Sequence, residues 1–469
     1  MNVRANIIHY IKSWIFFLAF VCIQHVGYAA EPEKETLECL ACPELTDPTQ
    51  YAKGAMKFMR QIVPGKNRWL FRSEVDFSHD FGLPAAVQPD FARLMATFKA
   101  RGTHIVFALQ PTRGLMHRDK IYPDRSHDFN FTKARANFKT YAAQLRAGGA
   151  IVPDITPLID HPPNQEYFYR RDHHWTPAGA RATAELVVEE IRHLPVYQTL
   201  TTRKYKTAPG VMVSRGGSMN MAMRQICDAS YSMQHIRGDQ TVPVDDDASI
   251  LFEDLPDPEV VLVGTSNSAA REEPNKQLNF DGYLKEYLET DILNYALPGS
   301  GYDGSLIEYL QSPDYHINKP PKIIIWEMPV NYQLENPLTY RQLIPAINGG
   351  CHDEPLLKNK INLPRLQIGQ RIELLSNMGA NSLALNGLQG LLRMHISDKS
   401  IRSFYIIIYY DNGNRDKVWF RREGIVSGGL YYLELNRSDE FKSSNIISVF
   451  MEPTQESNEQ ISIEAALCH

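Results

Sequence analysis

The stretch E-V-V-L-V-G-T-S-N-S, from Glu259 to Ser268, decides how this 469-residue chain is expected to fold. Its apolar part is short, rich in valine and continuous rather than alternating, which is typical of a parallel strand covered on both faces. The strand ends in a serine-rich turn. Because active sites of open α/β sheets lie at the carboxyl ends of the strands, Ser266 is a candidate nucleophile whose own backbone N–H can face a developing oxyanion.

Four further runs of the same kind predict a whole sheet rather than a single strand. They are His104–Leu109, Ala150–Val152, Asp291–Tyr295 and Lys322–Trp326. Helical patterns lie between several of these runs, and the clearest begins at Thr176 and Pro177, a good N-cap and first-turn pair. The predicted fold class is therefore α/β, with a doubly wound parallel sheet.

The pattern changes after about Asn348, where short strands separated by turns follow one another. The expected strands are Arg402–Tyr410, Val418–Arg421, Leu430–Leu435, Ile446–Met451 and Ile461–Ala466. This spacing is typical of an antiparallel β-sandwich. With the boundary placed near Ile347–Cys351, we expect a leader over 1–29, an α/β domain over 30–347 and a sandwich over 348–469.

The first thirty residues have the pattern of a secretory signal peptide. Arg4 and Lys12 precede the apolar run Trp14–Ile23. The small residues Gly27 and Ala29 then fit cleavage after Ala29. An uncleaved membrane anchor is the alternative, but the apolar run is shorter than a spanning helix needs. We therefore expect an exported protein, and its formal net charge of −5 argues against a nucleic-acid partner.

Export makes disulfide bonds the default for the cysteines that remain after cleavage. These cysteines are Cys39, Cys42, Cys227, Cys351 and Cys468. Cys39 and Cys42 form a C-x-x-C pair, a spacing also found in redox and zinc sites. However, no second C-x-x-C and no preceding strand accompany it. Because five is an odd number, one thiol is left over or reacts locally.

The stretch R-R-D-H-H-W-T-P-A-G-A, from Arg170 to Ala180, can supply the partners that a serine nucleophile needs. A serine requires a base, and the base requires an orienting carboxylate. Asp172 can orient His174, which can then reach Ser266. One alternative is a zinc site, for which the other histidines lie outside any ligand-like spacing. The other is a structural cluster that caps the following helix. We predict no metal and no cofactor.

Five motifs together resemble the SGNH-hydrolase-like proteins of alginate acetylation. They are G-K-N-R-W-L-F-R, Q-P-T-R-G-L, R-R-D-H-H-W-T-P-A-G-A, G-T-S-N-S and I-I-W-E-M-P, in that order. The resemblance covers essentially the whole mature chain. It implies a circularly permuted SGNH fold, with aspartate and histidine before serine, followed by a carbohydrate-binding module. It assigns the nucleophile to Ser266, the general base to His174 and the orienting acid to Asp172.

The resemblance also implies a function in the periplasm, namely transfer of acetyl groups to mannuronate hydroxyls of alginate through an acetyl-serine. The implied partners are alginate, an acetyl donor from a membrane acyltransferase system, and an alginate export scaffold of the periplasm and outer membrane. The two disulfides of the family fit Cys351 with Cys468, and Cys227 with an N-terminal cysteine. For the second bond we prefer Cys42 to Cys39.

A basic stretch in the C-terminal region is the candidate for polymer binding. Between Leu391 and Arg422 seven lysines and arginines stand against three aspartates. Alginate carries one carboxylate per sugar, arginine forks suit carboxylates, and exposed aromatic rings can stack on sugars. The candidate residues are Lys399, Arg402, Tyr405, Arg415, Lys417 and Trp419. The alternative is an ordinary solvated outer face of a sandwich, with Trp419 in the core.

Two other classes of function share these features. A secreted carbohydrate esterase would use the same triad with water as the acceptor. A non-catalytic polysaccharide-binding export scaffold would use only the binding module. The products formed from polymannuronate and an acetyl donor distinguish an esterase from a transferase. Loss of acetylation on substitution of Ser266 would count against a non-catalytic scaffold.

Overall fold

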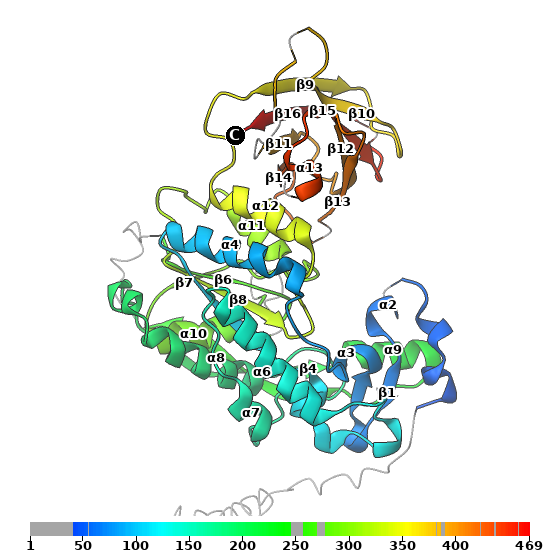
Figure 1. Ribbon diagram of the computed structural model, residues 1–469. Coiled ribbons are helices and arrows are strands. Elements are labelled where there is room, and N and C mark those ends of the chain that lie inside the picture. The colour runs from blue at the N-terminus through cyan, green and yellow to red at the C-terminus, as the bar shows by residue number, and fades with distance from the viewer. Residues whose placement is uncertain are drawn as a thin grey trace, which may run out of the picture. The chain divides into compact units, whose positions relative to one another are not determined.

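The computed structural model describes residues 41–54, 56–244, 257–269, 277–380, 382–385, 390–422, 424–435, 438–457 and 459–469 (Figure 1). The predicted signal peptide and Cys39 lie outside these residues. Within the described part of the chain, no helix has the length and apolar character needed to cross a membrane.

A parallel sheet forms the centre of the α/β domain. Its strands, in spatial order, are β3 (His104–Gln110), β8 (Ile323–Pro329), β6 (Val260–Val263) and β7 (Ile292–Asn294). All residues of β6 are buried, as its continuous valine-rich sequence predicts. The predicted strand at Ala150–Val152 is wrong in extent: only Ile151 pairs with the sheet, through one parallel bridge to Val106.

Helices cover both faces of this sheet, so the doubly wound α/β prediction is confirmed (Figure 1). One face carries α4 (Gln88–Ala100), α11 (Gly304–Leu310) and α12 (Pro337–Ile347), and the other carries α8 (Pro177–Arg192) and α10 (Phe280–Leu288). The helix α6 (Phe131–Ala147) ends against α4, where Gly148 approaches the Phe91 ring. The helix α8 starts as predicted, because the Thr176 side chain accepts a hydrogen bond from the Gly179 N–H. Its buried stripe includes Ala180, Ala184 and Val187.

A smaller lobe is assembled from two distant parts of the chain. Its first part contains η1 (Pro43–Thr46), η2 (Pro48–Tyr51), α2 (Met56–Met59), β1 (Ile62–Pro64), η3 (Lys66–Arg68), β2 (Leu70–Arg72) and α3 (Ser73–Asp76). Its second part is α9 (Ser218–Cys227). A disulfide between Cys42 and Cys227 joins the two parts. Cys42 is therefore unavailable for a C-x-x-C redox or zinc site.

The remaining elements of the α/β domain are connections and one ribbon. They are η4 (Ala85–Val87), α5 (Arg113–Met116), η5 (Arg118–Lys120), η6 (Pro123–Arg125), α7 (Thr156–Asp160), η7 (Pro195–Thr199), β4 (Tyr205–Arg215) and β5 (Gln234–Pro243). The strands β4 and β5 pair only with each other among the described strands, in antiparallel register. Most residues of these two strands are exposed or only partly buried. The sequence therefore contains no apolar run that would have predicted them.

The C-terminal region is a sandwich of two antiparallel sheets, which confirms the predicted class. One sheet has the order β10 (Ile372–Ser376), β15 (Ile446–Pro453), β12 (Ser403–Tyr410), β13 (Arg415–Arg421). The other has the order β14 (Leu430–Glu434), β11 (Leu391–Ile396), β16 (Ile461–Cys468), β9 (Leu357–Leu363). A short helix, α13 (Asp439–Lys442), precedes β15. The strands β9, β10 and β11 were not predicted, and a Cys351–Cys468 disulfide ties the last strand to the start of the region.

Candidate active site

His174 joins an aspartate and a serine that lie 94 positions apart in the chain. Its Nε2 lies 2.9 Å from Ser266 Oγ, and its Nδ1 hydrogen-bonds Asp172 Oδ1. Asp172 and His174 are each only 5% exposed, whereas Ser266 is partly exposed at the turn after β6. A deprotonating base, its orienting carboxylate and an accessible hydroxyl are thus aligned as nucleophilic catalysis requires.

Backbone donors hold Asp172 in its buried position. Its Oδ2 accepts from the Ser218 N–H at 2.9 Å, and its Oδ1 accepts from the His174 N–H at 3.0 Å. The preceding residue, Gly217, has φ +91, and a Cβ there would lie 2.2 Å from the Arg171 carbonyl oxygen. Only glycine allows this approach of α9 to the catalytic loop. Burial alone would raise the pKa of Asp172, but His174, His173 and Arg215 hold that pKa well below its ordinary value.

Arg113, in the Q-P-T-R-G-L motif, fixes the backbone of the same loop. Its guanidinium donates to the carbonyl oxygens of Asp172 (2.7 Å), Tyr169 (2.6 Å) and Leu70 (2.7 Å). It also pairs with Asp76 at 3.1 Å. Burial lowers the pKa of Arg113 to about 10, so it remains a cation at neutral pH. One buried charge therefore connects the catalytic loop to β2 and α3.

Asn267, the residue after Ser266, connects the serine turn to the histidine loop. Its carbonyl oxygen accepts from the Trp175 indole N–H at 3.0 Å, and its Nδ2 donates to Gln110 Oε1 at 3.1 Å. The Nε2 of Gln110 is a buried donor without a hydrogen-bond partner among the described residues. Gln110 also lines the cavity into which Ser266 opens.

Glu327, in the I-I-W-E-M-P motif, lies fully buried under the serine turn. Its carboxylate accepts from the Thr265 N–H at 2.8 Å, the Thr265 hydroxyl at 3.0 Å and the Ser268 hydroxyl at 3.1 Å. A Cβ on Gly264 would lie 2.6 Å from Glu327 Oε2, so the backbone passes close above the carboxylate. One side chain of β8 thus holds both ends of the turn that carries Ser266.

The stability of the protein is expected to depend on the protonation of Glu327. Burial raises the pKa of Glu327 to about 7 from its ordinary value of 4.5, although its hydrogen bonds act in the opposite direction. The folded state therefore favours the protonated form. The free energy of unfolding should be highest below pH 4.5 on account of this group, and should fall by about 3 kcal/mol as the pH rises to about 7.

Urea unfolding of the wild type and of Glu327→Gln, at several values between pH 4.5 and pH 8, measures this contribution. Glutamine can still accept from the Thr265 N–H and can donate to the two hydroxyl oxygens, so the fold should be kept. We expect the fall in unfolding free energy with pH to be shallower by about 3 kcal/mol in Glu327→Gln. The exposed Glu335→Gln serves as the control. Parallel pH profiles of the wild type and Glu327→Gln would contradict the assignment.

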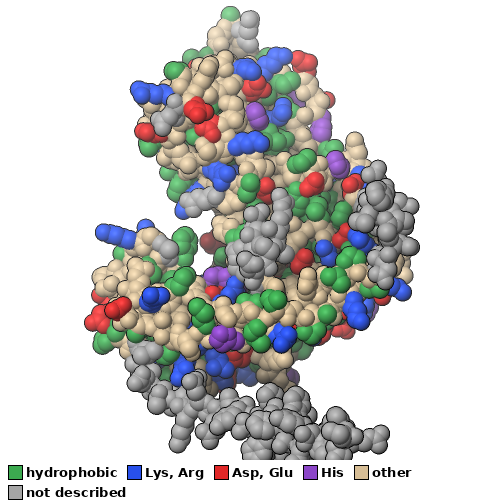
Figure 2. Space-filling view, turned by 180° about the vertical axis from the view of Figure 1, so that it is seen from behind, with side chains coloured by type: hydrophobic (Ala, Val, Ile, Leu, Met, Phe, Trp, Pro, Cys, Tyr) green, Lys and Arg blue, Asp and Glu red, His purple; other side chains and the backbone are tan. Residues whose placement is uncertain are grey.

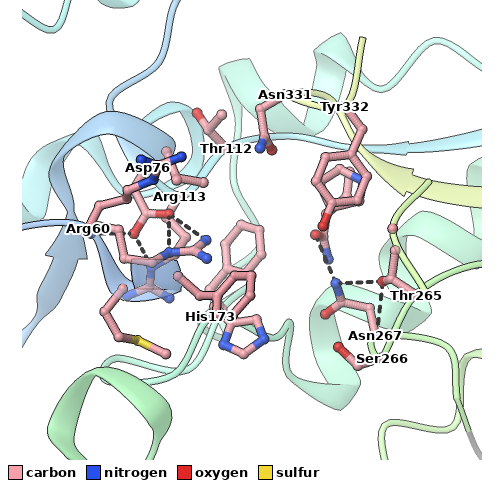
Figure 3. Close-up of a pocket in the computed structure, with 18 of the residues that line it drawn as sticks. Arg60, Asp76, Thr112, Arg113, His173, Thr265, Ser266, Asn267, Asn331 and Tyr332 are labelled. Carbon is pink, nitrogen blue, oxygen red and sulfur yellow. Dashed lines mark hydrogen bonds and ion pairs between the residues drawn. The ribbon is translucent and has the colours of Figure 1, made fainter. Parts of the chain in front are cut away.

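Ser266 opens into a cavity of about 450 Å³ (Figure 3). One wall carries the serine turn, with Thr265, Ser266 and Asn267, and Tyr332 lies above it in the view of Figure 3. The opposite wall comes from the smaller lobe and carries the charged side chains, among them Arg60 and Asp76. His173 also lines the cavity, and its Nδ1 lies 2.8 Å from Ser218 Oγ.

Asp172, His173 and His174 also have the residue types of a metal site. The ligand atoms of Asp172, His173 and His174 lie within 4.8 Å of one another, so the three can approach one ion. However, both ring nitrogens of His174 are engaged, by Asp172 and Ser266, and a tetrahedral zinc ion would displace these bonds. The hydrogen-bond directions fit a triad better than a ligand set.

Four of the six predicted polymer-binding residues lie on one outer face of the sandwich. Arg415, Lys417 and Trp419 alternate along β13, an edge strand, and their side chains are exposed. The rings of Tyr405 and Trp419 stack at 5.7 Å, and the Lys417 ammonium lies 4.0 Å from the Tyr405 ring centroid. Lys417 also pairs with Glu452 at 3.0 Å, which reduces the net charge of this face.

The other two predicted residues, Lys399 and Arg402, precede β12 and lie outside the strand face. The Arg402 Nε donates to the Lys399 carbonyl oxygen at 3.3 Å. Arg422, also part of the basic stretch, is not a surface residue. It is 4% exposed and donates to Gln342 of α12 at 2.6 Å, so it holds the sandwich against the α/β domain.

Sequence reasoning assigned no role to several residues that build the site. Arg113 and Glu327 stood in quoted motifs, but nothing local marks a charged residue as buried. Ser218 follows two consecutive glycines, Gly216 and Gly217. This pair of glycines before a helix was the one local signal that the helix could approach another segment closely. The bond from Ser218 to Asp172 spans 46 residues and is a product of the tertiary fold.

Comparisons with known proteins agree with this architecture. A family model described as an SGNH hydrolase-like domain of the acetyltransferase AlgX matches residues 62–330. A second model, for a C-terminal carbohydrate-binding module, matches residues 350–469. The chain is 31% identical over 458 residues to the alginate biosynthesis protein AlgX of Pseudomonas aeruginosa, covering 96% of this chain and 94% of that protein.

A solved structure and a shorter relative extend the comparison. The structure of Pseudomonas aeruginosa AlgX superposes with a TM-score of 0.80 at 30% identity, covering 92% of this chain and 99% of that chain. The probable alginate O-acetylase AlgJ of Pseudomonas putida is 29% identical over 287 residues, which is 58% of this chain and 70% of that protein. The chain therefore belongs to the AlgX family, whose members carry an SGNH hydrolase-like domain of the acetyltransferase type.

Proposed function

We propose that this protein is a periplasmic O-acetyltransferase that moves acetyl groups onto mannuronate hydroxyls of alginate through an acetyl-serine. The observation that carries the proposal is the single chain of hydrogen bonds from Asp172 through His174 to Ser266. Membership of the AlgX family supports it, because relatives are named as alginate biosynthesis proteins and probable alginate O-acetylases. The two disulfides suit an oxidising compartment such as the periplasm.

The first half of the reaction acetylates the serine. His174 Nε2 takes the hydroxyl proton of Ser266 as Oγ attacks the acetyl carbonyl carbon, and the carbonyl oxygen becomes an oxyanion. The Ser266 N–H is proposed to donate to it, with the Gln110 Nε2, unpartnered among the described residues, as a second candidate donor. The bond from the acetyl carbon to the leaving group then breaks, and the leaving group takes the proton from His174.

The second half transfers the acetyl group to the polymer. His174 takes the proton of a mannuronate hydroxyl, whose oxygen attacks the acetyl carbon, and the ester bond to Ser266 breaks. The proton returns from His174 to Ser266 Oγ, so the enzyme ends as it began. Asp172 keeps the imidazole oriented and stabilises its cationic form throughout. The acetyl donor is proposed to come from a membrane acyltransferase system, and the product to pass to an alginate export scaffold.

A two-substrate assay tests the proposal. The protein is incubated with 4-nitrophenyl acetate and polymannuronate, and polymer-bound acetyl ester and free acetate are both measured. Acetyl ester on the polymer, together with a mass increase of one acetyl group on Ser266, is the expected result. Acetate alone would identify a secreted esterase, and neither product with retained polymer binding would identify a scaffold.

The exposed face of β13 is proposed to hold the polymer near the site, which raises the local concentration of hydroxyl acceptor over water. Replacing Trp419 with alanine should weaken polymannuronate binding on the order of tenfold, as truncation of an aromatic anchor typically does. Calorimetric titration at two salt concentrations measures this, and binding should weaken with salt because exposed charges are screened. Lys360→Ala, on β9 of the other sheet, is the control. Binding that is unchanged in Trp419→Ala would place the acceptor on the catalytic domain alone.

A further inference from the structure

The charges around the cavity are strongly biased, although those of the whole protein are not. Among the described residues that line it, four are cations, Lys57, Arg60, Arg72 and Arg113, and one is an anion, Asp76. The chain as a whole has a formal net charge of −5. On the face shown in Figure 2, lysines and arginines are interspersed with acidic side chains. The excess of positive charge is therefore a local property of the wall opposite Ser266.

Two of these cations form ion pairs with a buried carboxylate, and the other two can bind a ligand. Arg72 and Arg113 both pair with Asp76, at 2.9 and 3.1 Å, and Asp76 is buried. Among the described residues Arg60 pairs with Glu74 alone, at 3.3 Å, and this solvent-exposed interaction is weak. Lys57 is exposed, and no hydrogen bond or ion pair joins its side chain to another described residue; its backbone N–H donates to the Gly54 carbonyl oxygen. The two cations that can bind a ligand, Lys57 and Arg60, thus lie at the solvent side of the cavity.

An exposed aromatic ring stands between these two cations. Phe58 also lines the cavity, and it is 70% exposed. The short helix α2 that carries Phe58 is anchored by Met56, which is 7% exposed, and lies against η2 and α9. A fixed turn therefore presents an aromatic ring flanked by two cations at the entrance to the nucleophile.

The size of the cavity indicates what this entrance contacts. A volume of about 450 Å³ suits a small ligand, so it cannot enclose a polymer. Sugars on either side of the reacting one must leave through the entrance. In a polyuronate each of those sugars carries a carboxylate and an apolar ring face. Cations and an exposed aromatic ring are the groups that recognise this combination.

We propose that Lys57, Phe58 and Arg60 form an acceptor subsite that binds the uronate sugars next to the reacting hydroxyl. The inference rests on the proposed transferase function and adds the residues that select an anionic acceptor. It places acceptor selection in the catalytic domain, separate from the polymer-binding face of the sandwich. Since Lys57 and Arg60 are exposed, their contribution should be electrostatic and should decrease with salt.

The test compares polymannuronate with its carboxyl-reduced, neutral form as acceptors, with 4-nitrophenyl acetate as the donor. In Lys57→Ala/Arg60→Ala, the KM for polymannuronate should rise on the order of tenfold, with little change for the neutral polymer. In Phe58→Ala, KM should rise for both polymers, because stacking does not depend on charge. Lys53→Ala, an exposed cation nearby that does not line the cavity, is the matched control.

The release of 4-nitrophenol before polymer is added reports acetylation of Ser266 separately. If the wild type acetylates no polymer, the proposed function fails. If it does, but the double variant keeps the KM of the wild type, the acceptor subsite is wrong. An equal loss with the charged and neutral polymers would also overturn it. So would a loss confined to 4-nitrophenol release, which would place the donor on this wall.

Discussion

Ser266→Ala is expected to reduce acetyl transfer to polymannuronate by on the order of 10⁴-fold or more. The substitution removes the atom proposed to carry the acetyl group, while its neighbours Thr265 and Ser268 keep their bonds to Glu327. The turn should therefore stay in place, and the unfolding free energy should change little. Initial rates of polymer acetylation, with thermal unfolding measured in parallel, check both parts of the prediction.

The three members of the triad should behave as one unit. His174→Ala and Asp172→Ala should each cost a comparable factor, and combining either with Ser266→Ala should add little. Asp172→Asn is the sharper test of orientation, because it keeps the shape but favours the wrong imidazole tautomer. His173→Ala is the neighbouring control and should be milder, since its ring contacts Ser218 rather than Ser266. Near-normal turnover in Ser266→Ala would exclude the covalent mechanism.

Removing the Cys351–Cys468 disulfide is expected to produce the largest loss of stability. The two Cα atoms lie 5.7 Å apart, and the bond closes a loop over 117 positions that contains nearly the whole sandwich. The chain-entropy estimate for a loop of this length is about 4–5 kcal/mol, and measured losses of native disulfides are about 2–5 kcal/mol. Cys468 is the last residue of β16, so its strand should be released first.

Urea unfolding of Cys351→Ala, Cys468→Ala and the double variant measures the effect. All three should lose a similar free energy, because each removes the same bond. Hydrogen exchange of β16 amides should rise in the same variants, while the amides of β6 stay protected. Unchanged urea midpoints would show that the disulfide contributes nothing to the folded sandwich.

Local sequence determined the sheet, the start of α8 and the order of the triad. The strands β3, β6 and β8 are buried on both faces, and burial requires a continuous apolar run that is visible without any partner. The Thr176 cap depends on four consecutive residues. Asp172, His174 and Ser266 could be proposed from the sequence because few side chains can serve as the orienting acid, the base or the nucleophile of a triad.

Only the tertiary structure decided how those residues meet and what supports them. Ser218 and Arg113 bind the Asp172 loop from distances of 46 and 59 positions, and Glu327 reaches the serine turn across 59 to 62 positions. A hydrogen bond between distant segments leaves no pattern in either segment. The strands β4 and β5 escaped detection for a related reason, since an exposed ribbon is stabilised by pairing rather than by an apolar face. Likewise, whether an arginine lies on the surface, as Arg415 does, or is buried, as Arg422 is, depends on the neighbouring domain and not on its own sequence.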